Sequence, residues 1–206
     1  MPATVKDANA LNLSLLLLLG LLWGMTYGLT KIALATIPPL TLVTARVCLA
    51  AAALWIVVLV SGTRRPTHRH GVVPIFVQGG LACAIPYTLI AFGQQSVDSA
   101  LAAILNSMAP LFVCLIGLAR TKSEPLTLGR WLGIALGLGG VTMIVGADSL
   151  AGLGKTAVGQ IAIVIATLSS AVGILYGRRF GDMAPELAAA GTLTAAPLCS
   201  FPSGRG

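Results

Sequence analysis

Long apolar runs separated by short polar segments dominate this chain of 206 residues. Six of the runs have about 20 residues, the length that an α-helix needs to cross the hydrocarbon core of a bilayer. A further run near the C-terminus is shorter and contains Pro197. The pattern predicts membrane-spanning helices over residues 11–34, 39–60, 72–92, 99–119, 126–145 and 157–176, and the start of another over 184–201.

The composition favours a membrane protein and excludes most soluble classes. Hydrophobic residues make up 56% of the chain, charged residues make up 9%, and the mean hydropathy is +0.93. A soluble domain has about 25% charged residues, so this chain has too little polar surface to cover a water-soluble globule. The net charge of +7 lies in short loops and forms no aromatic and basic patch, which argues against nucleic acid as a partner. We therefore expect an all-α, polytopic membrane protein.

Lysine and arginine residues gather on one side of the predicted helices. With the N-terminus inside, nine of them lie on the inner side, and only Lys155 clearly lies in an outer loop. Cytoplasmic loops of membrane proteins carry an excess of Lys and Arg. We therefore expect a cytoplasmic N-terminus and a bacterial-type inner (plasma) membrane. The nine residues are Lys6, Arg64, Arg65, Arg69, Arg120, Lys122, Arg130, Arg178 and Arg179.

No grouping of residues in the sequence predicts catalysis, a cofactor or a metal site. There is no Ser-His-Asp arrangement and no phosphate-binding glycine loop, and no Asp or Glu lies inside a confidently predicted span. His68 and His70 lie in a basic loop without neighbours that would complete a metal site. The four cysteines lie in apolar surroundings, where we expect them to act as small apolar side chains. We expect no enzyme activity, and the missing intramembrane carboxylate argues against an Asp/Glu proton relay.

Arg46 is the strongest candidate for a functional residue. It lies about seven residues into the second predicted span, on the order of 10 Å deep at the helical rise, and such an arginine costs roughly 2.5–3.5 kcal/mol on insertion scales. It therefore needs a partner. One interpretation is that Arg46 attracts an anionic group of a substrate, such as a carboxylate. The other is that it snorkels outward to Asp98 or caps helix carbonyls. Snorkelling also explains Lys31 at the outer edge of the first span, and we expect Gln94 and Gln95 to meet water.

Prolines accompany polar groups in the third and fourth predicted spans. Pro110 frees the backbone carbonyl of Asn106 and is expected to kink the fourth helix. Pro86 and Tyr87 are expected to have the same effect in the third. A kinked helix that carries an amide can line a polar cavity, and local packing against a neighbouring helix is the alternative. The predicted substrate-binding residues are Trp23, Arg46, Tyr87 and Asn106.

Glycines at four-residue spacing lie in two of the predicted helices. Gly24 and Gly28 lie in the first span, and Gly129, Gly133 and Gly137 lie in the fifth. Small residues at this spacing make one helix face smooth, so that a neighbouring helix can approach closely. We expect these five glycines to be helix-packing positions.

Weak internal similarity divides the chain. A shift of 146 positions aligns Pro39 with Pro185 and residues 40–51 with 186–197. Five predicted spans separate the two copies. Because a unit with an odd number of spans inverts when it is repeated, the implied architecture is five plus five helices of opposite topology.

Several segments, in their order and spacing, resemble the EamA type of the drug/metabolite transporter superfamily. These are residues 22–24, 37–46, 102–113, 123–127, 131–141 and 166–179. The resemblance covers roughly residues 12–197. It implies ten helices and the export or exchange of small metabolites or drugs by alternating access, in most cases without ATP. About three helices of the second repeat are missing, so we expect a C-terminally truncated member.

These observations divide the chain into a cytoplasmic N-terminal lead at residues 1–10, a first five-helix repeat at 11–146 and the start of an inverted second repeat at 147–206. The first hypothesis is a small-molecule transporter whose site lies near the bilayer midplane among the first four helices. The alternative is a non-transporting remnant, or a subunit that associates with other membrane helices. The expected partners are the lipid bilayer, a small-molecule substrate, and a second copy or partner chain that supplies the missing helices.

Overall fold

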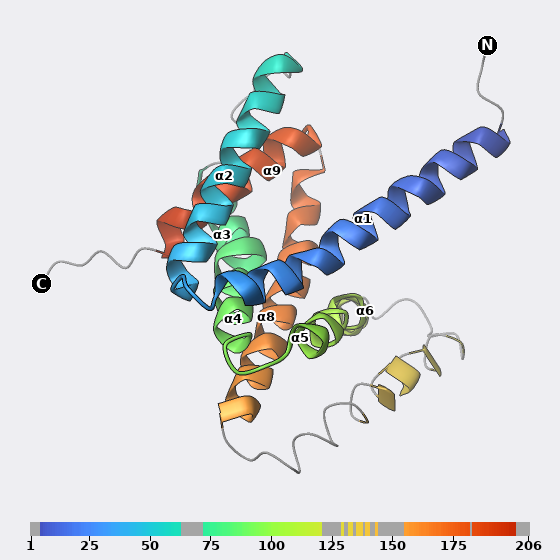
Figure 1. The fold of residues 1–206 in the computed structure, drawn as a ribbon. Helices are drawn as coiled ribbons and strands as arrows, with labels where there is room; N and C mark the ends of the chain where they lie inside the picture. Colours follow the sequence, from blue (N-terminus) through green and yellow to red (C-terminus); the bar gives the residue numbers. More distant parts are fainter. Residues whose placement is uncertain are drawn as a thin grey trace, which may run out of the picture.

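The computed structural model shows helices that cross at varied angles, with the long helix α8 in contact with α3, α4, α5 and α6 (Figure 1). The structure describes residues 5–62, 72–120, 155–181 and 183–200, and isolated positions between 129 and 143. These residues form helices and turns and no strand. The elements are α1 (Val5–Ala33), α2 (Pro39–Val60), α3 (Val72–Gly79), the π-helical turn η1 (Gly80–Ala84), α4 (Ile85–Gly93), α5 (Ser99–Asn106), α6 (Ala109–Arg120), α8 (Lys155–Gly177), the 3₁₀ turn η2 (Arg178–Phe180) and α9 (Pro185–Ser200).

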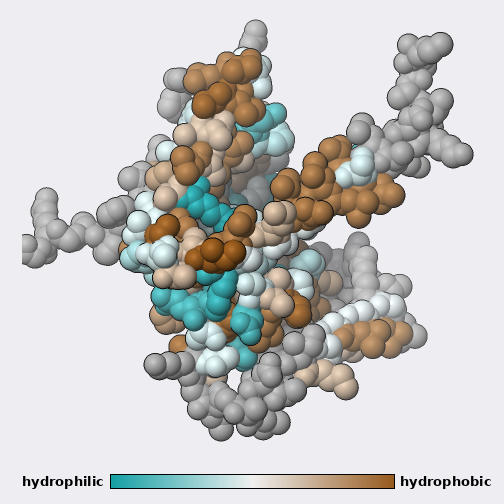
Figure 2. All heavy atoms as spheres, viewed as in Figure 1, coloured by the Kyte–Doolittle hydropathy of each residue, from teal (hydrophilic) through white to brown (hydrophobic). Residues whose placement is uncertain are grey.

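Five stretches of the described chain are long and apolar enough to cross a membrane. They are Asn12–Ala33, Pro39–Val60, Val73–Gly93, Ser99–Gly117 and Thr156–Phe180. They correspond to the first four predicted spans and the sixth, and they confirm the predicted all-α, polytopic class. Most of the predicted fifth span, 126–145, lies outside the described residues. Apolar side chains cover the outside of α1 where it projects from the other helices (Figure 2).

Helix α1 begins earlier than the sequence predicted. Its first residue is Val5, so part of the predicted lead at 1–10 is helical. Residues 5–10 contain no proline or glycine that would stop a helix. The stretch that can span a membrane still begins at Asn12, so the correction concerns the helix and leaves the predicted span nearly unchanged.

The third predicted helix contains a π-helical turn. The Ile85 N–H bonds to the Gly80 carbonyl, five residues earlier. Pro86 follows and has no N–H, so the Leu81 carbonyl lacks the partner that the same register would supply. The Ser169 hydroxyl on α8 donates a hydrogen bond of 2.9 Å to this carbonyl. A neighbouring helix thus completes the backbone hydrogen bonding that the proline interrupts.

The fourth predicted helix is divided into two. Helix α5 ends at Asn106, and α6 begins at Ala109, directly before Pro110. The Ser107 N–H still bonds to the Ala103 carbonyl at 3.0 Å, so the break follows a normal helical turn. The buried Thr167 hydroxyl of α8 lies 3.4 Å from the Leu105 carbonyl at this break. A single kinked helix was predicted, and the structure has two helices with a short turn between them.

Helix α9 packs against α2 and α3. It continues through Pro197 to Ser200, so the proline within this short apolar run does not end the helix. The Trp55 indole N–H of α2 donates a 2.9 Å hydrogen bond to the Thr194 hydroxyl of α9. Helices α2 and α9 begin at Pro39 and Pro185, the two prolines that the shift of 146 positions aligns.

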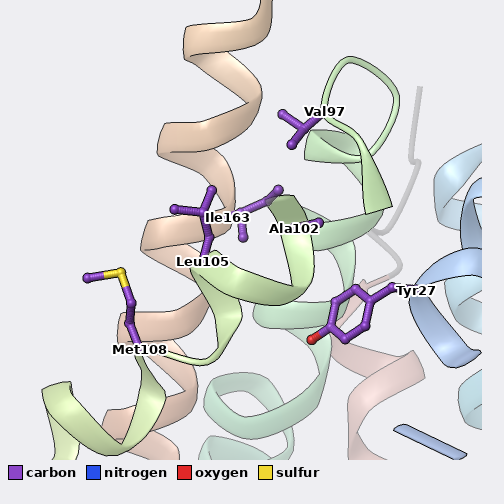
Figure 3. Packing of buried hydrophobic residues seen from close by; sticks show 6 residues of the cluster. All are labelled: Tyr27, Val97, Ala102, Leu105, Met108 and Ile163. Carbon is purple, nitrogen blue, oxygen red and sulfur yellow. The ribbon is translucent and has the colours of Figure 1, made fainter. Parts of the chain in front are cut away.

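The core near α5 joins three parts of the chain. Tyr27 of α1 and Ile163 of α8 pack with buried residues of α5 and its flanking turns (Figure 3). The side chains of Leu105 and Ile163 are fully buried. Because these residues are distant in sequence, their packing fixes where α1 and α8 lie relative to α5. The cluster consists of Tyr27, Val97, Ala102, Leu105, Met108 and Ile163.

Close helix crossings occur at glycines other than the predicted ones. A Cβ atom built on Gly93 would lie 2.6 Å from the Gly159 carbonyl oxygen, and one on Gly173 would lie 2.9 Å from Ala82 Cα. By contrast, no neighbouring atom of the described chain lies within 4 Å of such a Cβ at Gly24 or Gly28. The same is true of the predicted packing positions Gly129, Gly133 and Gly137. The close packing predicted at these five glycines is therefore not made within the described chain, because the helices cross elsewhere.

Candidate functional site

A cavity of about 840 Å³ lies between α1, α2, η1, α4, α5 and α8. Its volume is in the range of small-molecule sites, about 300–1,000 Å³. Most of its wall is apolar, and none of the described residues that line it is Asp or Glu. The polar and aromatic lining residues are Trp23, Thr26, Tyr27, Thr30, Arg46, Tyr87, Gln94, Asn106 and Ser170.

All four residues predicted to bind substrate line this one cavity. Trp23 comes from α1, Arg46 from α2, Tyr87 from α4 and Asn106 from the end of α5. Their common location follows from the packing of four helices that are separate in sequence. The structure brings the predicted residues together, and their binding of a substrate remains a prediction.

Arg46 contacts an aromatic ring. Its guanidinium carbon lies 5.3 Å from the centroid of the Tyr87 ring, within the distance of a cation–π interaction. Both side chains belong to described residues, and no ion pair of the described chain joins Arg46 to Asp98, which is exposed. Within the described chain, the observed partner of Arg46 is therefore the ring of Tyr87 and not the carboxylate of Asp98.

Tyr27 is a central residue of the site that the prediction omitted. Its hydroxyl lies beside the side chains of Trp23 and Asn106, and the charge of Arg46 acts on it. Figure 3 shows the ring reaching from α1 toward α5. Trp23 and Tyr27 are four residues apart and so share one face of α1. This spacing was the available signal, because it places Tyr27 on the same face as a predicted site residue.

Lys31 and Gln94 connect α1 to the turn between α4 and α5. The Lys31 ammonium donates hydrogen bonds of 2.6 Å to the Gln94 carbonyl and 2.8 Å to the Val97 carbonyl. The Gln94 side-chain amide donates a bond of 3.1 Å to the Tyr27 carbonyl and is 1% exposed. The prediction that Gln94 meets water is wrong, because its side chain is buried against α1. The snorkelling of Lys31 stays a prediction, and its ammonium group bonds to carbonyls that the turn leaves without helical partners. Gln95 is exposed.

The two predicted kink prolines lie beside cavity residues. Pro86 directly precedes Tyr87 and follows the π-helical turn. Pro110 follows the break after Asn106. The Thr167 hydroxyl lies 3.4 Å from the Asn106 side-chain oxygen, so α8 contacts the amide at the point where α5 ends. Among the described residues, no group of three His, Cys, Asp or Glu side chains is placed to hold a metal ion.

Comparison with known proteins matches the model of the EamA-like transporter family to residues 11–146. The chain belongs to the EamA-like transporter family. It is 32% identical over 161 residues to the uncharacterized inner membrane transporter YedA of Escherichia coli K12, a match that covers 77% of this chain and 50% of YedA. It is 22% identical over 158 residues to the uncharacterized transporter YoaV of Bacillus subtilis, covering 77% of this chain and 54% of YoaV.

No solved structure matches this EamA-like chain. The chain spans about half the length of the curated relatives that it matches. The family resemblance seen in the sequence is confirmed. Together with the five apolar helices, the match to inner membrane transporters shows a membrane-embedded protein.

Proposed function

We propose that this EamA-like chain provides the substrate cavity of a membrane transporter for small organic solutes, and that Arg46 holds an anionic group of the solute. The observation that carries the proposal is the position of Arg46 in the wall of an 840 Å³ cavity that no acidic residue of the described chain lines. An arginine within a membrane span is costly unless it faces a cavity, water or a partner. The relatives YedA and YoaV are named as transporters.

The contact with Tyr87 leaves Arg46 able to bind an anion. A guanidinium group is planar and carries five N–H donors around its edge. The tyrosine ring interacts with it 5.3 Å from the ring centroid, and no hydrogen bond or ion pair of the described residues uses those donors. A carboxylate can bind such an edge through two parallel hydrogen bonds. Tyr87 then acts as a support that positions the charge.

The proposed mechanism is alternating access without ATP, in the inner membrane with the N-terminus in the cytoplasm. In this orientation the turn between α4 and α5 faces outward. The hydrogen bonds of Lys31 and Gln94 hold α1 against that turn, which in this mechanism forms the outer gate. Opening to the outside requires these bonds to break, and the other side of the cavity must then close around the solute.

Transport in proteoliposomes, with and without Arg46, tests this function. Counterflow of labelled carboxylates is compared for the wild-type chain, Arg46→Lys and Arg46→Ala. We expect Arg46→Lys to keep part of the activity and Arg46→Ala to keep little, because lysine retains the charge but not the planar donors. Arg179→Ala is the matched control, since Arg179 lies 4.4 Å from the Tyr176 ring centroid but does not line the cavity. Equal transport by Arg46→Ala and wild type contradicts the proposal.

A second candidate function is association with other membrane helices without transport. The exposed leucines of α1 favour it, since only 6% of its most apolar window is buried within the chain. Pull-down of a tagged copy from mixed membranes, scored beside counterflow, separates the two. Stable association without counterflow of any carboxylate supports the second candidate, and Arg46-dependent counterflow supports the first.

A further inference from the structure

We propose that the anion taken by this cavity carries a flat aromatic ring, which stacks on Trp23 while its carboxylate meets Arg46. The inference rests on the proposed function, because it names the substrate class of the same cavity. It selects an aromatic carboxylate over an aliphatic acid of similar size. It also excludes organic cations.

Trp23 is the most exposed of the described aromatic residues in the cavity wall. Its side chain is 59% exposed although it lines the cavity wall. The ring of Tyr27 is 8% exposed and packs in the core, and the ring of Tyr87 is occupied by Arg46. Of the three aromatic side chains in the wall, Trp23 therefore has the most surface left for a ligand ring.

The indole of Trp23 has polar neighbours within the site. The Tyr27 hydroxyl lies beside both the Trp23 and the Asn106 side chains. The same hydroxyl and amide can bond to a polar substituent on the ring. The charge of Arg46 acts on Tyr27, which places the cation and this aromatic group in one electrostatic environment.

The charge of the residues that line the cavity determines whether an anionic or a cationic ligand group can bind there. Among the described residues that line the cavity, Arg46 alone is charged, and a guanidinium group is a permanent cation in proteins. An ammonium group in this space would meet a like charge without a carboxylate to offset it. Offset stacking between aromatic rings adds to the gain from burying their area. A flat ring is thus preferred to a saturated one when both carry a carboxylate.

Equilibrium binding to the purified full chain tests the inference separately from transport. Labelled benzoate is displaced by cyclohexanecarboxylate, octanoate or benzylamine, with empty micelles as the blank. We expect benzoate to bind about fivefold more tightly than cyclohexanecarboxylate or octanoate, and benzylamine not to compete. Trp23→Leu should bring benzoate and cyclohexanecarboxylate within about twofold, and Trp23→Phe should keep most of the preference. Trp55→Leu is the matched control, because the Trp55 indole bonds to Thr194 outside the cavity.

The outcomes separate this inference from the proposed function. One outcome is that Arg46→Ala loses all carboxylate binding while the wild type shows no preference for benzoate. This outcome leaves the proposed function standing and overturns the aromatic ligand. Octanoate that binds as tightly as benzoate also overturns it, and points to a lipid-derived acid. Competition by benzylamine at the level of benzoate overturns the charge selection. A chain that binds none of the acids contradicts both proposals.

Discussion

The Lys31 ammonium group donates a 2.6 Å hydrogen bond to the backbone carbonyl of Gln94, which lies 63 residues later in the chain. The Gln94 side chain in turn donates to the carbonyl of Tyr27, one turn before Lys31 on α1. The two bonds connect the same two segments in opposite directions. They hold the end of α1, which has few other contacts, against the turn between α4 and α5.

Replacing Lys31 should loosen α1. In Lys31→Met, the carbonyls of Gln94 and Val97 lose a charged donor, and hydrogen bonds to charged groups contribute about 1.5–3 kcal/mol each when buried. Because the bonds are part-buried, we expect a total loss nearer 1–3 kcal/mol. The measurement is the thermal midpoint by fluorescence-detected size-exclusion chromatography. Lys31→Arg keeps the donors and should lose less, whereas a Met variant as stable as wild type would show that the bonds do not stabilise the fold.

Replacing Ser169 should destabilise the protein by removing the hydrogen bond that compensates for the missing N–H of Pro86. The Ser169 hydroxyl bonds to the Leu81 carbonyl, and Ser169→Ala leaves that carbonyl without its donor. An unsatisfied buried polar group costs about 1–3 kcal/mol, which should lower the thermal midpoint. The adjacent Ser170 lines the cavity, so Ser170→Ala is the matched control and should change the midpoint little. Equal effects of the two substitutions contradict the assignment.

Alanine at the helix crossing of α4 and α8 should destabilise the protein. The Cβ atoms of Gly93→Ala and Gly159→Ala would lie 2.6 and 2.9 Å from the carbonyl oxygen of the other residue. Overpacking of this kind costs roughly 1–3 kcal/mol. Gly24→Ala and Gly28→Ala meet no described atom within 4 Å and should be neutral or stabilising, since alanine favours a helix by about 0.5–1 kcal/mol over glycine. Comparable thermal midpoints for the two pairs of variants would contradict the close approach of α4 and α8 at Gly93 and Gly159.

Cysteine labelling in intact bacterial cells tests the orientation. In a background without native cysteines, Gln95→Cys and Ser61→Cys place thiols at two exposed positions, in the α4–α5 turn and at the end of α2. With the N-terminus in the cytoplasm, a membrane-impermeant maleimide should label position 95 and spare position 61. Both should react after lysis. The reverse pattern would invert the proposed topology.

The sequence predicted most of the helices and four of the residues that line the cavity, for one physical reason. Lipid makes the length of an apolar run informative and makes each polar group within it costly. Trp23, Arg46, Tyr87 and Asn106 were selected because each is unusual inside an apolar span, and the structure places all four around one cavity. The family assignment followed from the order of several short segments.

The contacts that the sequence did not predict depend on where helices cross. The periodicity of a single helix carries no information about where another helix crosses it. Gly93 and Gly159 meet across α4 and α8, yet neither belongs to a four-residue glycine series. Lys31 donates to carbonyls of a turn far along the chain. Its position within the first span alone does not predict these partners. The break after Asn106 likewise became a turn between two helices, since the Thr167 hydroxyl of α8 lies beside the carbonyl of Leu105 there.

The π-helical turn at Gly80–Ala84 also sets the rotational phase of everything after it. Each residue advances an α-helix by about 100°, so one residue accommodated in the turn points Tyr87 and Gln94 in a different direction from the one an uninterrupted helix would give them. Converting the turn to regular α-helix by substitution, without a change in length, would barely change the hydropathy of the span. It would nevertheless rotate the tyrosine away from Arg46 and the glutamine away from α1, so two chains with nearly the same hydropathy profile would differ in whether they have this cavity at all.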